Sequence, residues 1–162
     1  AMTAQELGAG GIMAAPGLLG LSIIRELSSA PDFHLPIFLH PCFSGPLVLS
    51  ADSGVSPFCY YGQFSRLAGA DAAIFTSFGG RFPFTEEVCR KICDGTETEM
   101  GGLRSIFPVP SGGMKWQLFK KMVQVYGPDA IFLVGGALLT ESDDLTANMH
   151  FYFEKLNEAV NK

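Results

Sequence analysis

Two glycine pairs in this chain stand where a protein backbone can bind an anion. Ser111-Gly112-Gly113 follows an apolar run that begins at Phe107, and Gly135-Gly136 follows a second run that begins at Phe132. Helical spacing comes after each pair, which predicts two strands that end in a turn and open into a helix. Glycine allows a positive φ and a close backbone approach, and N–H groups ahead of a helix attract an anion. Together the pairs predict a phosphate cradle, although a strand followed by two glycines also fits a simple tight turn.

His40 is a further candidate, because it ends the apolar run 35–39 and lies close to Ser44-Gly45. An imidazole at the end of a buried strand can exchange a proton or contact a phosphate. The alternative is a structural histidine whose nitrogens are hydrogen-bonded within the fold. Ser111 has no histidine or aspartate near it in the sequence, so we expect it to hydrogen-bond a ligand rather than to act as a nucleophile.

The cysteines do not form a metal motif. Cys42, Cys59, Cys89 and Cys93 include no Cys-x-x-Cys pair and have no histidine at a zinc-binding spacing. Cys89 and Cys93 share one face of a predicted helix, where we expect them to pack as small apolar residues. Reduced thiols are typical of a cytoplasmic protein, and we expect that location here.

The composition is that of a single domain with an unusually high apolar content. The 162 residues are 48% hydrophobic and only 17% charged, with a net charge of −5. The acidic balance argues against a nucleic-acid partner, and no apolar run reaches the roughly 18–20 residues of a membrane span. We expect the surplus apolar surface to be covered in a homodimer or by an N-terminal half that is missing from this sequence.

Strand and helix patterns alternate along the chain. Predicted strands cover residues 12–16, 35–40, 71–76, 104–110 and 129–134, and predicted helices cover 16–29, 56–68, 85–93, 114–127 and 144–160. Short connections between apolar strands predict parallel units with right-handed crossovers. Residues 1–10 show no periodicity and are expected to be a disordered leader or a remnant of cloning, which leaves 11–162 as the domain.

The fold class that this pattern predicts is α/β, with about four βα units that form the second half of a (β/α)8 TIM barrel. Strands that are apolar at every position are buried on both faces, which also fits an open doubly wound sheet. The barrel is favoured because successive strands end in polar or glycine residues, and because no strand opens into a Gly-x-Gly-x-x-Gly turn. A complete barrel takes about 250 residues, so the chain corresponds to part of one.

Four sequence blocks, taken in order, are more specific than any one of them alone. They are His40-Pro-Cys-Phe-Ser-Gly45, Tyr61-Gly-Gln-Phe-Ser-Arg-Leu-Ala-Gly-Ala-Asp71, Phe107-Pro-Val-Pro-Ser-Gly-Gly-Met114 and Tyr126-Gly-Pro-Asp-Ala-Ile-Phe-Leu-Val-Gly-Gly136. Together they resemble the C-terminal part of the catalytic barrel in the RuBisCO large-subunit superfamily, and in particular the RuBisCO-like proteins. The resemblance implies that His40 and Arg81 are catalytic, with Arg81 in a mobile loop over residues 78–84. It also implies that the two glycine pairs and Ser111 bind the substrate phosphate.

The sequence departs from the carboxylases of this family at two strand ends. Pro41 follows His40 where carboxylases have an arginine, and Thr76-Ser77 stands in place of a second histidine. Loss of these cations favours a substrate with one phosphate over a bisphosphate. Arg81 stands near a lysine position of the carboxylases and cannot deprotonate as lysine does, which argues against carboxylation.

The resemblance implies Mg²⁺ as a cofactor, held in the family by a carbamylated lysine and two carboxylates upstream of this sequence. The adjacent acids Glu86-Glu87 and Asp143-Asp144 stand at helix starts, where we expect caps and solvated charges rather than metal ligands. We therefore expect no metal site in this chain.

The implied activity is that of an isomerase, enolase or decarboxylating lyase, which acts on a phosphorylated keto sugar through an Mg-stabilised enediolate. The chain by itself is expected to be inactive. The alternative is a non-catalytic half-barrel that keeps the phosphate cradle and self-associates.

Overall fold

The computed structural model describes residues 1–50, 52–80 and 82–161, which form two compact units. The first unit comprises Ala1–Phe75 and Lys91–Pro108, and the second unit comprises Thr76–Arg90 and Val109–Lys162.

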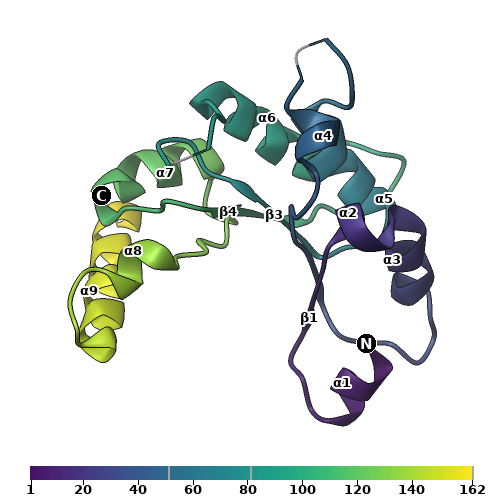
Figure 1. Ribbon diagram of the computed structural model, residues 1–162, viewed down its shortest axis with the longest axis horizontal. Coiled ribbons are helices and arrows are strands. Elements are labelled where there is room, and N and C mark those ends of the chain that lie inside the picture. Colours follow the sequence, from purple (N-terminus) through teal and green to yellow (C-terminus); the bar gives the residue numbers. More distant parts are fainter. Residues whose placement is uncertain (51, 81, 162) are drawn as a thin grey trace. The chain divides into compact units, whose positions relative to one another are not determined.

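A four-stranded sheet has the order β1-β2-β3-β4 (Figure 1). Its strands are β1 (Ile12–Ala14), β2 (Ile37–Leu39), β3 (Ala72–Thr76) and β4 (Phe107–Ser111). β1 pairs in parallel with β2, with Ile12 opposite Ile37, and β2 pairs in parallel with β3, with Phe38 opposite Ala72. Parallel neighbours in sequence order confirm the predicted βα units.

The strand predicted over residues 129–134 is wrong in extent, because only one parallel bridge forms there, between Leu133 and Ser111. The Leu133 N–H donates to the carbonyl oxygen of Pro110 at 3.1 Å. Alternate residues of a strand face the same neighbour, so Pro108 and Pro110 both face residues 129–134. Proline has no N–H to donate, and the ladder is therefore limited to a single bridge.

Helices precede β1, occupy the connections between the strands and follow β4. They are α1 (Met2–Glu6), α2 (Pro16–Leu19), α3 (Leu21–Ser28), α4 (Gly45–Val48), a π-helix (Phe58–Phe64) continued by α5 (Ser65–Leu67), α6 (Glu86–Glu97), a 3₁₀ turn (Trp116–Leu118) continued by α7 (Phe119–Tyr126), α8 (Gly136–Leu139) and α9 (Leu145–Val160). The single helix predicted over residues 16–29 is divided into α2 and α3, because Gly20 has a φ of 83°.

The helix predicted over residues 85–93 extends further in the structure, because α6 continues through Gly95 to Glu97. The reason is a close backbone approach within the first unit. A Cβ atom on Gly95 would lie 2.5 Å from the carbonyl oxygen of Phe58 and 3.2 Å from the Cα of Gly62. Gly95 therefore serves the packing of α6 against the π-helix rather than the end of α6.

Residues 1–10, predicted as a leader, contain α1. The Gln5 side chain donates to the carbonyl oxygen of Asp32 at 2.7 Å and accepts the N–H of His34 at 2.8 Å. These bonds connect α1 to the segment that leads into β2.

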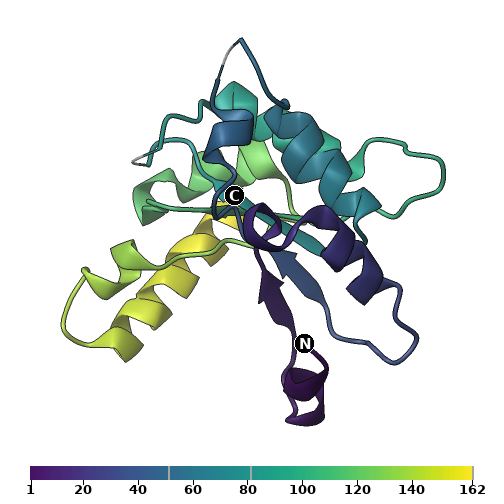
Figure 2. The ribbon, with the colours of Figure 1, turned by 45° about the vertical axis from the view of Figure 1, so that its right-hand side comes forward.

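Each unit has its own apolar core. In the first unit, Ile24, Ile37 and Leu39 are buried together. In the second unit, the Phe119 ring contacts the rings of Phe132 and Tyr152, with centroids 5.6 and 5.8 Å away. α9 packs against α7 and α8 (Figures 1 and 2). In the described part of the chain, no helix combines the length and apolar character needed to cross a membrane.

Candidate active site

The first glycine pair follows β4 in the second unit. Gly112 and Gly113 have φ values of 79° and 86°. L-residues with a side chain rarely adopt a φ in this range, which explains why glycine occupies both positions. A turn after a strand can present backbone N–H groups to an anion, which is the role predicted for this pair.

The segment after β3 fixes this turn. The Ser77 N–H donates to the Ser111 carbonyl at 2.7 Å. A Cβ atom on Gly80 would overlap the carbonyl oxygen of Gly112, and one on Gly112 would lie 3.1 Å from the Phe82 ring. Gly80 is therefore required by close backbone contact, and one side of Gly112 is covered by an aromatic ring.

The second glycine pair follows the bridge between Leu133 and Ser111. Leu133, which bridges to Ser111, is followed after one residue by Gly135 and Gly136. No atom lies within 4 Å of the position of a Cβ on either glycine, so the space next to this pair is open. The bridge brings the start of the second glycine turn to Ser111. We call the five residues predicted to bind phosphate, namely Ser111, Gly112, Gly113, Gly135 and Gly136, the cradle.

Ser77 is held by a buried hydrogen bond that the sequence does not indicate. Its hydroxyl lies 2.7 Å from the Tyr126 hydroxyl at the end of α7, and both side chains are buried. The Cys89 thiol is a further neighbour that affects the pKa of Tyr126. Burial raises the pKa of Tyr126 and of Cys89, so both groups remain protonated at neutral pH. This network holds the start of the segment from which Gly80 and Phe82 approach Gly112.

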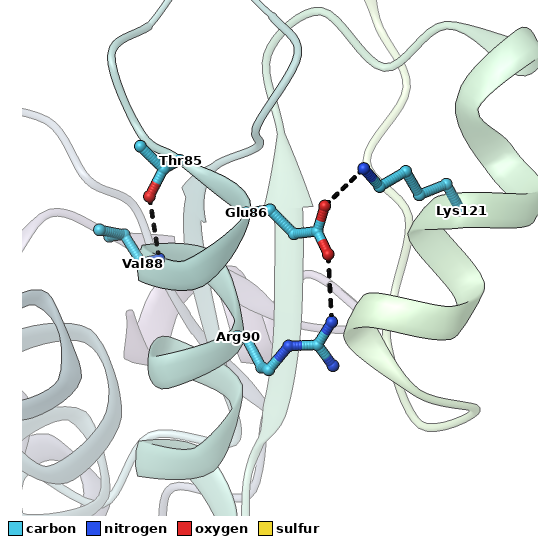
Figure 3. Close-up of polar contacts among 5 residues, drawn as sticks. All are labelled: Thr85, Glu86, Val88, Arg90 and Lys121. Atoms are coloured by element: carbon cyan, nitrogen blue, oxygen red, sulfur yellow. Dashed lines mark hydrogen bonds and ion pairs between the residues drawn. The ribbon is translucent and has the colours of Figure 1, made fainter.

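The end of the same segment is secured by charges (Figure 3). Lys121 Nζ on α7 lies 2.5 Å from Glu86 Oε2, and Arg90 donates to Glu86 Oε1 at 3.2 Å. The hydrogen bond from Lys121 is the main cause that lowers the pKa of Glu86. Lys121 Nζ also lies 5.7 Å from the centroid of the Phe78 ring. α7 therefore anchors both ends of residues 78–85.

Thr85 caps α6, since its Oγ1 accepts the Val88 N–H at 3.3 Å (Figure 3). Arg81, the second predicted catalytic residue, lies outside the described residues.

His40 belongs to the first unit, where it directly follows β2 and is exposed. Its Nδ1 accepts the N–H of Cys42 at 3.2 Å. A neutral imidazole that accepts at Nδ1 carries its proton on Nε2, so His40 presents a hydrogen-bond donor. Ser44 steadies this turn, because its hydroxyl donates to Pro41 O at 2.6 Å and lies 2.7 Å from the buried Tyr61 hydroxyl.

The described residues contain no cluster of three or more histidine, cysteine, aspartate or glutamate side chains that could hold a metal ion. The side chains present here do not fit the Mg²⁺ site that the family resemblance implies, and no chemical step is assigned to a metal.

Comparison with known proteins gives a consistent result, although no family model matches the chain. The 5-methylthioribulose-1-phosphate isomerase of Rhodospirillum rubrum is 36% identical over 148 residues, which are 89% of this chain and 37% of that protein. The 2,3-diketo-5-methylthiopentyl-1-phosphate enolase of Exiguobacterium sibiricum is 33% identical over 141 residues, 87% of this chain and 35% of that protein. This chain thus spans little more than a third of the length of these curated relatives.

A solved structure extends the similarity to the fold. The RuBisCO-like protein MtnW of Alicyclobacillus acidocaldarius aligns with 98% of this chain and 42% of its own, with a TM-score of 0.86 and 28% identity. The predicted partial barrel is confirmed by this match. In sequence and in fold, the chain corresponds to the C-terminal part of the catalytic barrel of RuBisCO-like proteins in the RuBisCO large-subunit superfamily.

Proposed function

We propose that this chain forms the phosphate-binding part of a RuBisCO-like enzyme that acts on a phosphorylated keto sugar. The observation that supports the proposal is the bridge between Ser111 and Leu133, which joins the residue before the first glycine pair to a residue two positions before the second pair, within one unit. The names of both relatives describe a substrate with a phosphate at one position. A single cradle fits a single phosphate.

The chemistry that we assign begins with loss of a proton from the carbon next to the substrate carbonyl, which gives an enol for isomerisation or further enolisation. The N–H group of Gly113 and those of the second glycine pair would hold the phosphate and thereby fix the distance between the phosphate and the reacting carbons. His40 would donate from Nε2 to a substrate oxygen or assist proton transfer. Arg81 would contact the bound substrate.

The Mg²⁺ that the resemblance implies would be held by residues outside this chain. The described residues offer no such site, so we expect that Mg²⁺ alone leaves the backbone amide spectrum of the chain unchanged in a titration.

Phosphate binding at the cradle is tested with a matched pair of variants. Gly136→Leu adds a side chain within the cradle, and no atom lies within 4 Å of its Cβ position. Gly10→Leu adds the same side chain at another position whose Cβ would meet no atom within 4 Å. A titration with glycerol phosphate, followed by amide chemical shifts, is expected to perturb residues 111–113 and 135–137 in the wild type and in Gly10→Leu. Gly136→Leu should bind at least about tenfold more weakly, because the ligand loses hydrogen bonds to a charged group. Equal affinity of all three proteins would refute the cradle.

Catalysis is tested by exchange of a substrate C–H proton into deuterium oxide. We expect no exchange when 5-methylthioribulose 1-phosphate and Mg²⁺ are added to the chain alone. We expect exchange when the upstream part of the Rhodospirillum rubrum relative is supplied. Absence of exchange in both mixtures, with the phosphate still bound, would favour the non-catalytic alternative.

The alternative, a half-barrel that self-associates, is favoured by one face of α9. Leu145, Met149 and Phe153 recur every four residues and are 51%, 46% and 58% exposed. Such a stripe on a helix normally faces another apolar surface. We expect a dimer in sedimentation velocity at micromolar concentration and a monomer for Phe153→Lys, whereas a monomeric wild type would contradict self-association.

A further inference from the structure

A hollow lined by arginines lies in the first unit, at the amino ends of β3 and β4. Its volume is about 200 Å³, and its lining includes Arg25, Arg66, Asp71, Arg104 and Ser105. A second hollow of about 280 Å³ shares Asp71 and Arg104 with the first, so the two adjoin. None of these residues belongs to the cradle or supports it.

The hollow has an excess of positive charge. Three arginines line it against one acidic side chain, Asp71, and Oδ2 of Asp71 already accepts the Ile37 N–H at 2.9 Å. The protein as a whole carries a net charge of −5, so the local excess of cations contrasts with the overall charge. A partly enclosed group of like charges attracts a counter-ion.

Two of the arginines also have structural partners. The buried Arg66 donates to the carbonyl oxygens of Gly95, Thr98, Leu103 and Arg104, which close the end of α6 and the segment after it. Arg25 donates one N–H to the Leu67 carbonyl at 3.0 Å, which leaves most of its donors for another group.

Arg104 is different, because its guanidinium makes no hydrogen bond or ion pair with any of the described residues. The same holds for the Ser105 hydroxyl, which lines the same hollow. A guanidinium and a hydroxyl that line one hollow are donors of the kind that recognise an oxyanion. The hydrogen bonds of Arg66 to backbone carbonyls give that residue a structural role. Arg104 makes no such bonds with the described residues, so the same role does not account for it.

The geometry points to a second anion site, in which Arg104, Arg25 and Ser105 bind a phosphate group. The hollow has room for a phosphate and accompanying water, and the adjoining hollow has room for the organic part of a phosphate ester. The ligand class is therefore a phosphate dianion, either inorganic or as a small monoester. This site is independent of the proposed function, because it shares no residue with the cradle.

The site is tested by amide chemical shifts in titrations with inorganic phosphate and, in a separate arm, with glycerol phosphate at matched ionic strength. We expect both probes to shift the amides of Gly69 and Ser105. Tighter binding of glycerol phosphate would assign the monoester as the ligand, and equal or weaker binding would assign inorganic phosphate. Arg104→Gln should weaken binding at these amides at least about tenfold, because a hydrogen bond between two charged groups is lost.

Controls separate this site from the cradle and from general charge effects. Lys120→Gln removes an exposed cation of α7 and should leave the shifts at Gly69 and Ser105 unchanged. Gly136→Leu should also leave them unchanged, so failure of the cradle and failure of this site give different results. Arg104→Gln is expected to fold, because its exposed side chain has no partner among the described residues, and Ser105→Ala provides a second, smaller loss of affinity. Unchanged affinity of Arg104→Gln, or no shift at Gly69 and Ser105 in the wild type, would overturn the proposal.

Discussion

The hydroxyl groups of Ser77 and Tyr126 lie 2.7 Å apart in the interior of the second unit, although 49 positions separate the two residues. Ser77 also donates its backbone N–H to Ser111, the first residue of the cradle. The side chain of Tyr126 thus fixes the residue that holds β4 at its carboxyl end.

Tyr126→Phe is expected to lower the free energy of unfolding by about 1 kcal/mol, the usual net contribution of one buried hydrogen bond. Urea denaturation measures this loss. Tyr152→Phe is the matched control, because the Tyr152 hydroxyl makes only a long bond of 3.4 Å to Glu141. Equal losses in the two variants would show that the Ser77 contact has no particular role.

Stability is expected to fall as the pH rises above 10, the ordinary pKa of tyrosine. Burial raises the pKa of Tyr60, Tyr61 and Tyr126 in the folded protein. Above pH 10 the unfolded chain therefore loses protons that the folded chain keeps, which favours unfolding. Thermal unfolding between pH 8 and pH 11 measures the slope. Tyr126→Phe should make this slope shallower, and an unchanged slope would argue against burial of the Tyr126 hydroxyl.

Glu86→Gln is expected to lower the melting temperature slightly at neutral pH and low salt. The variant loses the ion pair with Lys121 and a negative charge in the first turn of α6. The pKa of Glu86 is lowered in the fold, so its contribution is present above pH 4.5, its ordinary value, and is lost as the pH falls below it. The difference from wild type should therefore vanish in acid and at high salt.

The control for this measurement is Glu26→Gln, which removes an exposed carboxylate of α3 that has no ion pair among the described residues. A difference that persists at high salt would show that the contribution of Glu86 is not electrostatic.

Gly95→Ala is expected to destabilise the protein by about 1–3 kcal/mol, the usual cost of overpacking. The result is informative because the same change in an open helix normally stabilises it by roughly 1 kcal/mol. The new methyl group would meet the Phe58 carbonyl oxygen at 2.5 Å. Gly10→Ala, where no atom lies within 4 Å, should change the free energy of unfolding little. A stabilised Gly95→Ala variant would contradict the close packing of α6 and the π-helix.

The sequence by itself determined the βα units, their parallel order and the two glycine pairs. These features depend on residues within a few positions of one another, namely the strand periodicity, the glycine and proline positions and the helix caps. A local sequence pattern therefore predicts them. The four sequence blocks also identified the part of the barrel to which the chain corresponds.

Only the tertiary structure decided where contacts between residues distant along the chain change the elements that the local pattern predicts. By local pattern, a glycine such as Gly95 indicates the end of a helix, whereas in the fold Gly95 lies inside α6 and packs against Gly62. Gly62 is distant along the chain, so the local pattern does not contain this contact. The prolines of β4 reduce the next strand to one bridge, and Tyr126 reaches Ser77 only when α7 is folded. Contacts of this kind depend on the three-dimensional arrangement of the elements, which no periodicity within one element can record.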